Sequence, residues 1–353
     1  MEFGELSREE FRELSKRSKC GSFLQSEEMR RRYEKKGLEY YLLGVRRNGE
    51  VLAGMLVVTT RSVKGKKIFK AAGGPLLDYE AERAPEILKL LTREAKAFLR
   101  GKGGLVLQVN PNIVSEPRDR KNNIVPGVDH LAVKKYLQGL GWKYLGEYEQ
   151  VKWEYVMETA GEDLEELFMG LRSDHRQRIR RARRDGVKIR ELGLDELQVL
   201  KKIAAEAGDR HGFHDPSVDY YKEMAEAFGE KVKFMVAEAP VEGEMIPVTA
   251  AMFVMDKPRE IVYLFSGSVR EYQKLGGAHL LQWEMISQAV NEGYARYNFY
   301  GVRPVEGDGV YKFKQGFKAG RVEELLGTFM LPLCLLGWVY TLRIRPQEMG
   351  AVE

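Results

Sequence analysis

Two stretches of this chain, far apart in the sequence, have the same order of strands and turns, and this repetition constrains the fold more than any single motif. Residues 41–58 predict two strands joined at Asn48-Gly49, a dipeptide typical of tight hairpins. Residues 233–255 predict a second hairpin, with a longer turn around Gly243. Because generic strand patterns recur by chance, the hairpins alone do not establish a duplication.

A helix that leads into a buried strand comes after each hairpin. This pair covers residues 86–110 in the first half and 280–302 in the second, with Gly103 and Gly293 at the helix-to-strand turns. The hairpin and the helix–strand pair therefore both recur, at a similar interval along the chain. In a chain of 353 residues, enough for two domains of ordinary size, the pattern predicts an α/β (α+β) protein with two mixed sheets flanked by helices.

Positive charge is concentrated in residues 172–190, in a chain that is otherwise close to neutral. The whole chain has 57 Lys and Arg against 52 Asp and Glu, a net charge of +5. This segment alone has eight arginines and one lysine against two aspartates, or +7, which leaves −2 for the rest. Such a balance argues against a protein that coats nucleic acid over its whole surface.

The basic segment is expected to follow a first short helix, as two helices or one broken helix over residues 162–186. On a helix over 173–184, four arginines share one face: Arg176, Arg180, Arg183 and Arg184. Guanidinium groups bind phosphate in a bidentate manner, so one interpretation is a brief grip on part of an RNA. The other is a solvated helix whose arginines pair with acidic neighbours.

The cysteines and the N-terminal residues indicate a cytoplasmic protein. Cys20 and Cys334 are far apart, which fits neither a disulfide framework nor a zinc pattern. The first residues are charged and have no apolar signal core.

One long apolar stretch lies near the C-terminus. Residues 325–342 are eighteen positions without a charge, close to the roughly 20 that a spanning helix needs. Pro332 interrupts the stretch, so we expect a buried strand up to Leu331 and then a short apolar helix packed on the body of the protein. A helix lying on a membrane surface is the alternative.

A short motif opens the helix of the second repeat. Gln273, Gly276 and Ala278 match Q-x-x-G-x-A between an expected strand and helix. In N-acetyltransferase folds this loop presents backbone N–H groups to the pyrophosphate of acetyl-CoA. The motif therefore permits an acyl-CoA-dependent N-acyltransferase.

Residues 263–320, together with the arginine helix, resemble the Fem family of peptidoglycan-bridge aminoacyltransferases. The matching segments occur in family order and cover most of the chain: 21–37, 172–189, 209–213, 264–289, 293–302 and 309–320. The resemblance implies two tandem acetyltransferase-like (GNAT-like) domains. The first, which binds the precursor, would take residues 1–155 and 326–353, and the second 156–325. No sustained heptads follow Val187, so we expect no coiled-coil arm.

Members of this family transfer an amino acid from aminoacyl-tRNA to an amine of a peptidoglycan precursor, which is either lipid-linked or nucleotide-linked. The ester is already activated, so the step requires no ATP, cofactor or metal. The resemblance thus implies that the arginine helix contacts the tRNA, and the apolar C-terminal segment suggests work at the inner face of the membrane. An acyl-CoA-dependent enzyme and a non-enzymatic RNA- or partner-binding module remain the alternatives.

The resemblance also assigns site residues. Lys314, in the stretch KFKQGF, matches the family lysine thought to stabilise the oxyanion of the transfer reaction. The alternative is a surface lysine beside the buried Phe313 and Phe317.

Precursor binding is assigned to Lys36, for which Lys35 is a near-equal alternative, and to Arg210; both would contact the diphosphate. His214 falls near a position where some members place an aromatic contact residue. The family often has an aspartate considered as a base where this chain has Asn110, and an amide is no useful base at neutral pH. Asn110 is therefore expected to bind substrate rather than to take a proton. No general base is therefore assigned.

Overall fold

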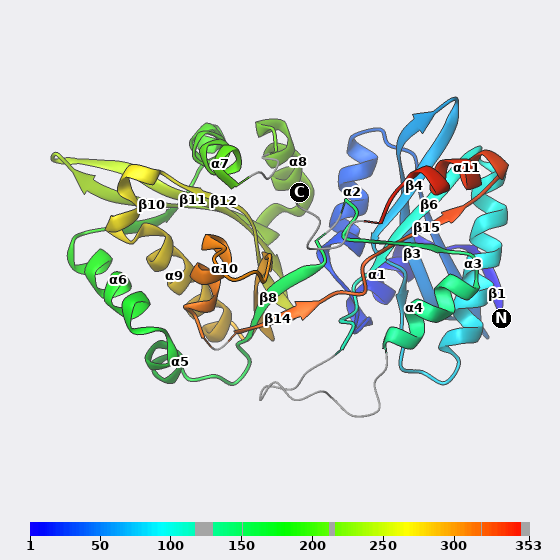
Figure 1. The fold of residues 1–353 in the computed structure, drawn as a ribbon, viewed down its shortest axis with the longest axis horizontal. Helices are drawn as coiled ribbons and strands as arrows, with labels where there is room; N and C mark the ends of the chain where they lie inside the picture. Colours follow the sequence, from blue (N-terminus) through cyan, green and yellow to red (C-terminus); the bar gives the residue numbers. More distant parts are fainter. Residues whose placement is uncertain (117–129, 150, 212–215, 319, 347–353) are drawn as a thin grey trace. The chain divides into compact units, whose positions relative to one another are not determined.

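The computed structural model describes residues 1–116, 130–149, 151–211, 216–318 and 320–346, and its ribbon is drawn in Figure 1. The chain divides into two compact units. The first unit takes Met1–Lys152 and Glu323–Glu353, and the second takes Trp153–Val322. The limits expected from the sequence stand at 155/156 and 325/326.

The first unit is built on an eight-stranded mixed sheet in the order β1-β2-β3-β4-β6-β15-β7, with β5 beside β3. Its strands are β1 (Glu2–Glu5), β2 (Tyr40–Arg47), β3 (Glu50–Val63), β4 (Lys66–Gly73), β5 (Leu76–Leu77), β6 (Gly104–Pro111), β7 (Lys143–Gly146) and β15 (Thr328–Pro332). Strands β4 and β6 run parallel, so the chain must cross over between them.

Helices cover this sheet on both faces. They are α1 (Arg8–Arg17), η1 (Phe23–Gln25), α2 (Glu27–Lys35), α3 (Ala84–Gly101), α4 (His130–Gly139) and α11 (Leu335–Arg343). Helix α3 makes the crossover between β4 and β6 and buries Leu88, Leu91 and Ala95 at helical spacing. These side chains and Val109 of β6 line a small apolar cavity, so α3 packs on the face of the sheet to which Val109 points.

The second unit is built on a seven-stranded sheet in the order β14-β8-β13-β12-β11-β10-β9. Its strands are β8 (Trp153–Glu158), β9 (Lys188–Glu191), β10 (Val232–Val241), β11 (Glu244–Asp256), β12 (Glu260–Ser268), β13 (Arg296–Gly301) and β14 (Gly320–Glu324). Here β12 and β13 are the parallel pair. The long helix between them is therefore the counterpart of α3.

The helices of the second unit include the basic segment. They are α5 (Leu164–Gly170), α6 (Ser173–Arg184), η2 (Leu194–Glu196), α7 (Leu197–His211), α8 (Val218–Phe228), η3 (Gly229–Lys231), η4 (Arg270–Leu275), α9 (Gly277–Asn291) and α10 (Gly309–Gln315). The expected pair of helices over 162–186 is confirmed as α5 and α6. Ile179 and Ala182 of α6 are fully buried in one core cluster with Leu280 and Leu281 of α9. Its arginines are left on the other side.

The two sheets have the same strand order, which confirms the duplicated α/β plan. Reading from β1 in the first unit and from β9 in the second, each position has a counterpart, and β4–β6 corresponds to β12–β13. One exchange stands out. Strand β8 follows the first unit's β7 but pairs in the second sheet, while β15 follows the second unit's β14 but pairs in the first sheet. Each sheet is therefore completed by a strand that follows the other.

The two hairpin turns are alike, which corrects one expectation. Asn48 and Gly49 both have positive φ angles, 51° and 82°, in a two-residue loop between β2 and β3. Glu242 and Gly243, at 53° and 90°, form the same kind of loop between β10 and β11, where a longer turn was expected. Both hairpins also have a shift of register before the turn, between Val45 and Arg46 in β2 and between Ala237 and Glu238 in β10.

The C-terminal apolar stretch forms a strand and a helix, as expected. Strand β15 is buried along its whole length, and α11 begins at Leu335 after a break at 333–334. Gly337 and Tyr340 lie on the side of α11 that meets the sheet of the first unit. None of the helices in the described ranges is long and apolar enough to cross a membrane.

Candidate active site

Lys314 lies in the interior of the second unit, with its ammonium group held by the main chain. Its helix, α10, is capped at the N-terminus by Asp308, whose carboxylate accepts the N–H of Tyr311 at 2.7 Å. Only 4% of the Lys314 surface is exposed. Its Nζ donates to the carbonyl oxygen of Phe299 at 2.8 Å, to that of Tyr300 at 3.3 Å, and to that of Gly301. The surface-lysine alternative is therefore wrong.

These three carbonyls converge because β13 is irregular at its end. Along a regular strand successive carbonyls point in opposite directions, so three in a row cannot face one group. Tyr300 has a φ of 59°, and the register with β8 shifts between Asn298 and Gly301. The side-chain oxygen of Asn298 accepts the N–H of Tyr300 at 2.7 Å and holds this bend. A tyrosine in the left-handed region is strained, and such residues cluster at functional sites.

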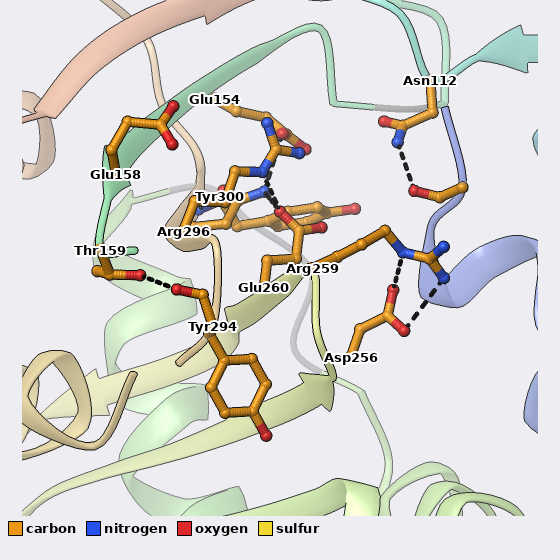
Figure 2. Close-up of polar contacts among 12 residues, drawn as sticks. Asn112, Glu154, Glu158, Thr159, Asp256, Arg259, Glu260, Tyr294, Arg296 and Tyr300 are labelled. Atoms are coloured by element: carbon orange, nitrogen blue, oxygen red, sulfur yellow. Dashed lines mark hydrogen bonds and ion pairs between the residues drawn. The ribbon is translucent and has the colours of Figure 1, made fainter. Parts of the chain in front are cut away.

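Two buried carboxylates flank the same bend. Figure 2 shows Glu154 of β8 and Glu260 of β12 on either side of it, near Arg296 and Tyr300. The amide of Asn298 donates to a carboxylate oxygen of Glu154 at 3.0 Å and to one of Glu260 at 3.1 Å. The Nε of Arg296 donates to the same oxygen of Glu260 at 2.7 Å. The bend therefore brings together the ammonium group of Lys314 and two carboxylates whose positions are fixed by hydrogen bonds.

Burial decides the proton affinity of this lysine. Desolvation lowers the pKa of Lys314 from 10.5 to about 7, and the negative charges of Glu154 and Asp308 offset part of that effect. An amine with this pKa changes charge near neutral pH, so its ability to stabilise a negative charge depends on pH in that range.

The sequence did not identify Glu154, Asn298, Glu260 and Tyr300 as site residues. A signal was present, because Glu154 and Asn298 interrupt apolar strands at positions where a hydrophobic residue is the norm. Both are buried, with 5% and 2% of their surface exposed. What joins them is the pairing of β8, β12 and β13, which no local pattern predicts.

The residues expected to bind the precursor are only partly described. Asn110 is buried in β6, and its side-chain oxygen accepts the N–H of Gly73 at 3.3 Å. Lys36 is exposed directly after the last turn of α2, where Lys35 is the final residue. Arg210 lies near the end of α7, but its side chain, like the whole of His214, falls outside the described residues.

Two of the four helix arginines have structural contacts. Arg176 donates through Nη1 to the carbonyls of Met169, at 2.7 Å, and of Leu171, which ties α6 to the end of α5. The guanidinium of Arg180 lies over the ring of Phe168, 5.2 Å from its centroid.

The other two arginines have exposed ion pairs. Arg183 contacts Glu284 at 2.8 Å, and Arg184 contacts Asp185 at 3.1 Å. Their side chains are 52% and 74% exposed. Exposed pairs of this kind contribute little to stability, so a phosphate can replace the carboxylate partner at small cost.

Helix α6 also packs directly on the Q-x-x-G-x-A loop. Gly276 has a φ of 78°, and a Cβ placed there would lie 2.9 Å from the carbonyl oxygen of Arg178 and 3.3 Å from Cβ of Ala182. At Gly276, the backbone of the loop is therefore in close contact with α6.

Comparisons with known proteins agree in pointing to one group. A sequence model of the FemAB family matches residues 6–243 and 241–340. Aminoacyltransferase FemA of Staphylococcus epidermidis is 22% identical over 409 residues, covering 94% of this chain and 96% of that protein. Aminoacyltransferase FemA of Staphylococcus aureus (strain MRSA252) is 22% identical over 370 residues, covering 84% of this chain and 87% of that protein.

Solved structures show a similar fold. The crystal structure of FemX superimposes with a TM-score of 0.80 at 16% identity, covering 98% of this chain and 100% of that one. A tandem GNAT protein from the clavulanic acid biosynthesis pathway gives a TM-score of 0.60 at 11% identity, covering 94% and 98%. The tandem acetyltransferase-like architecture predicted from the sequence is thereby confirmed.

Proposed function

Since the chain belongs to the FemAB family, we propose that it transfers an amino acid from an aminoacyl-tRNA to an amine on the stem peptide of a peptidoglycan precursor. It is an aminoacyltransferase in class, as are the two staphylococcal FemA relatives. Within the structure, one observation carries the proposal: a buried ammonium group, that of Lys314, lies at a strained strand end beside fixed carboxylates.

The reaction makes modest demands on the protein. The amine attacks the ester carbonyl, the carbonyl oxygen becomes an oxyanion, and the tRNA hydroxyl leaves as the amine loses its proton. The protein must orient both substrates and stabilise the negative oxygen. Lys314 is assigned to the oxyanion. The hydrogen bond from its Nζ to the carbonyl of Tyr300 is 3.3 Å long, whereas the bond to the carbonyl of Phe299 is 2.8 Å long. The longer bond is the easier one to exchange for a bond to a substrate oxygen.

A positioning role is assigned to Glu154. Its negative charge favours the charged form of Lys314 and thus opposes the desolvation that would otherwise neutralise the ammonium group. Asn298 holds this carboxylate in place at 3.0 Å. The group that takes the proton of the attacking amine stays unassigned.

Binding of the two substrates is assigned as the family resemblance implies. The exposed Arg183 and Arg184 of α6 would contact tRNA phosphates, with Arg180 beside them. Lys36 and Arg210 would contact the diphosphate of the precursor. We place the enzyme in the cytoplasm, at the inner face of the membrane.

The test is a direct assay of transfer. Purified protein is incubated with each aminoacyl-tRNA and with lipid-linked or nucleotide-linked precursor, and the acceptor is analysed by mass spectrometry. A mass increase of one aminoacyl residue is expected for at least one pair. Acetyl-CoA replaces the tRNA in a parallel incubation. Acetylation there, without aminoacyl transfer, would replace the proposal by the acyl-CoA alternative, and binding of tRNA without any product would favour the non-enzymatic module.

A further inference from the structure

Helix α11 exposes large apolar side chains that a helix on a protein surface normally buries. Among the described residues, eleven large hydrophobic side chains are exposed, and five of them are on this helix: Leu335, Leu336, Trp338, Val339 and Leu342. Leu335 is 82% exposed and Leu342 72%. The buried positions of the helix are Gly337 and Thr341. Its amphipathic pattern is therefore inverted, with the small residues inside and the large apolar residues outside.

This orientation is held firmly by the rest of the first unit. A Cβ at Gly337 would collide with the carbonyl oxygen of Leu105, so the helix backbone lies directly on β6. Tyr340 packs against the core cluster on this face. At the end of the helix, Lys143 donates through Nζ to the carbonyls of Thr341 and Ile344 at 2.6 and 2.7 Å. A loose helix thus does not account for the exposed apolar face.

Positive charge borders the same face. Arg61, near the tip of the β3–β4 hairpin, donates to the hydroxyl of Tyr340 at 3.3 Å, so the hairpin lies beside α11. The exposed basic side chains of the hairpin and of the end of the helix form what we call the basic rim: Arg61, Lys64, Lys66, Arg343 and Arg345. Glu149 pairs with Arg61 at 3.5 Å and offsets one of these charges. The surroundings of the apolar face are therefore net positive.

We propose that α11 and the basic rim dock the enzyme on the surface of an anionic phospholipid bilayer, with α11 lying in the plane of the interface. A nine-residue helix is about 14 Å long, too short to cross but suited to the headgroup boundary. Leucines and a tryptophan enter that boundary readily, and basic side chains add attraction to anionic lipid.

Charge favours a bilayer over a second copy of this chain. In a symmetric dimer the same patch is used by both copies, so two basic rims would be brought into one contact, where their like charges repel. An anionic lipid surface complements both parts of the patch at once. The inference specifies the membrane contact of the proposed function but does not depend on which acyl group is transferred.

Vesicle binding tests the proposal. The full-length protein is sedimented with vesicles of phosphatidylglycerol and phosphatidylcholine, and with vesicles of phosphatidylcholine alone. Binding to the anionic vesicles is expected, together with a blue shift of Trp338 emission that the Trp338→Phe variant loses. The double variant Leu335→Ser/Leu342→Ser should bind at least tenfold more weakly. Reversing Lys64 and Lys66 to Glu should weaken binding about 25-fold or more, at about fivefold for each charge lost.

Controls separate this surface from other exposed apolar residues. Leu194→Ser/Val305→Ser removes two exposed apolar side chains of the second unit and should bind vesicles as the wild type does. The proposal is overturned if the wild type does not sediment with anionic vesicles, or if the α11 variant binds equally well. It is also overturned if the wild type is a dimer that the α11 variant dissociates. Transfer to the nucleotide-linked precursor should be unchanged in the α11 variant, so failure here is distinct from failure of the proposed reaction.

Discussion

At the scale of single residues, Lys314 combines two properties that a solvent-exposed lysine lacks. Its ammonium group is anchored by three main-chain carbonyls, and desolvation lowers its pKa to about 7. The carbonyl contacts fix the position of the ammonium group, and the lowered pKa makes its protonation sensitive to neighbouring charges. The family resemblance led to this residue, but the bend at Tyr300 depends on strand pairing and could not be predicted from local sequence.

Replacing Lys314 should impair the chemical step more than binding. We expect Lys314→Met to reduce the transfer rate by about 10²–10³-fold, the usual cost of losing one oxyanion donor. The affinities for tRNA and precursor should stay nearly constant. Lys312→Met is the matched control, because this lysine is exposed on the same helix. Single-turnover rates and equilibrium binding check the prediction, and a variant that loses binding and rate together would contradict it.

The same lysine predicts a pH dependence. The ammonium form is present below the pKa of about 7, so the ratio of the wild-type rate to the Lys314→Met rate should fall as pH rises through that value. Taking the ratio cancels the titration of the attacking amine. Glu154→Gln removes a negative charge that raises the pKa of Lys314, so the midpoint should move to lower pH. A midpoint unchanged in Glu154→Gln would refute the positioning role of Glu154.

Stability should respond to pH with the opposite trend. In the folded protein Lys314 loses its proton near pH 7, whereas in the unfolded chain it holds the proton up to about 10.5. Between these values the unfolded state binds more protons, so this residue makes stability rise with pH. Urea unfolding of the wild type and of Lys314→Met at several pH values measures the effect. The difference in stability between the two proteins should shift in favour of the wild type as pH rises.

At the scale of elements, α6 shows what a sequence pattern can predict and what it leaves open. The helix has the expected span, Ser173–Arg184, because its apolar positions and the glycine after it are local signals. The roles of its arginines are not local. Arg176 faces the end of α5, whereas Arg183 reaches Glu284 of α9, a contact that depends on how the two helices pack.

This division of roles sharpens the tRNA prediction. Arg180→Ala/Arg183→Ala/Arg184→Ala should weaken tRNA binding and reduce the slope of log affinity against log salt by roughly 2–3, since each of the three phosphate contacts contributes about 0.7–0.9. Lys222→Ala, an exposed change on α8, is the control and should leave the slope unchanged. Binding measured between 50 and 300 mM salt distinguishes the two. An unaltered affinity in the folded triple variant would remove α6 from the tRNA site.

At the scale of the whole molecule, the duplicated plan was predictable from local patterns, whereas the return of the C-terminal residues to the first domain was expected only from the family resemblance. Hydrophobic patterns identify Thr328–Pro332 as a buried strand, but they do not say which sheet it joins. Consecutive strands usually pair near one another, and β15 breaks that tendency by pairing with β6 and β7 of the first unit. The first sheet is therefore complete only when the C-terminal segment is present.

The exchange makes the two units unequal as separate fragments. A fragment of residues 153–324 keeps all seven strands of its sheet, so we expect it to fold and to unfold cooperatively in urea. A fragment of residues 1–152 lacks β15, and with it the buried Phe329, Met330 and Leu331. At about 1.5–3 kcal/mol for each, that burial is comparable to the whole stability of a domain. Its absence also leaves the edges of β6 and β7 open to aggregation.

The fragment of residues 1–152 should therefore be insoluble, or unfolded as judged by circular dichroism. Restoring the missing strand to this fragment tests the cause. Joining residues 323–346 to the end of 1–152 through a flexible glycine–serine linker returns β15 and α11 to the first sheet, so solubility and a cooperative transition should return. Replacing Phe329 and Leu331 by Asp in the joined protein is the control, because it keeps the length but prevents burial of the strand. If 1–152 alone folded as stably as the joined protein, the exchanged strand would not be what completes the first unit.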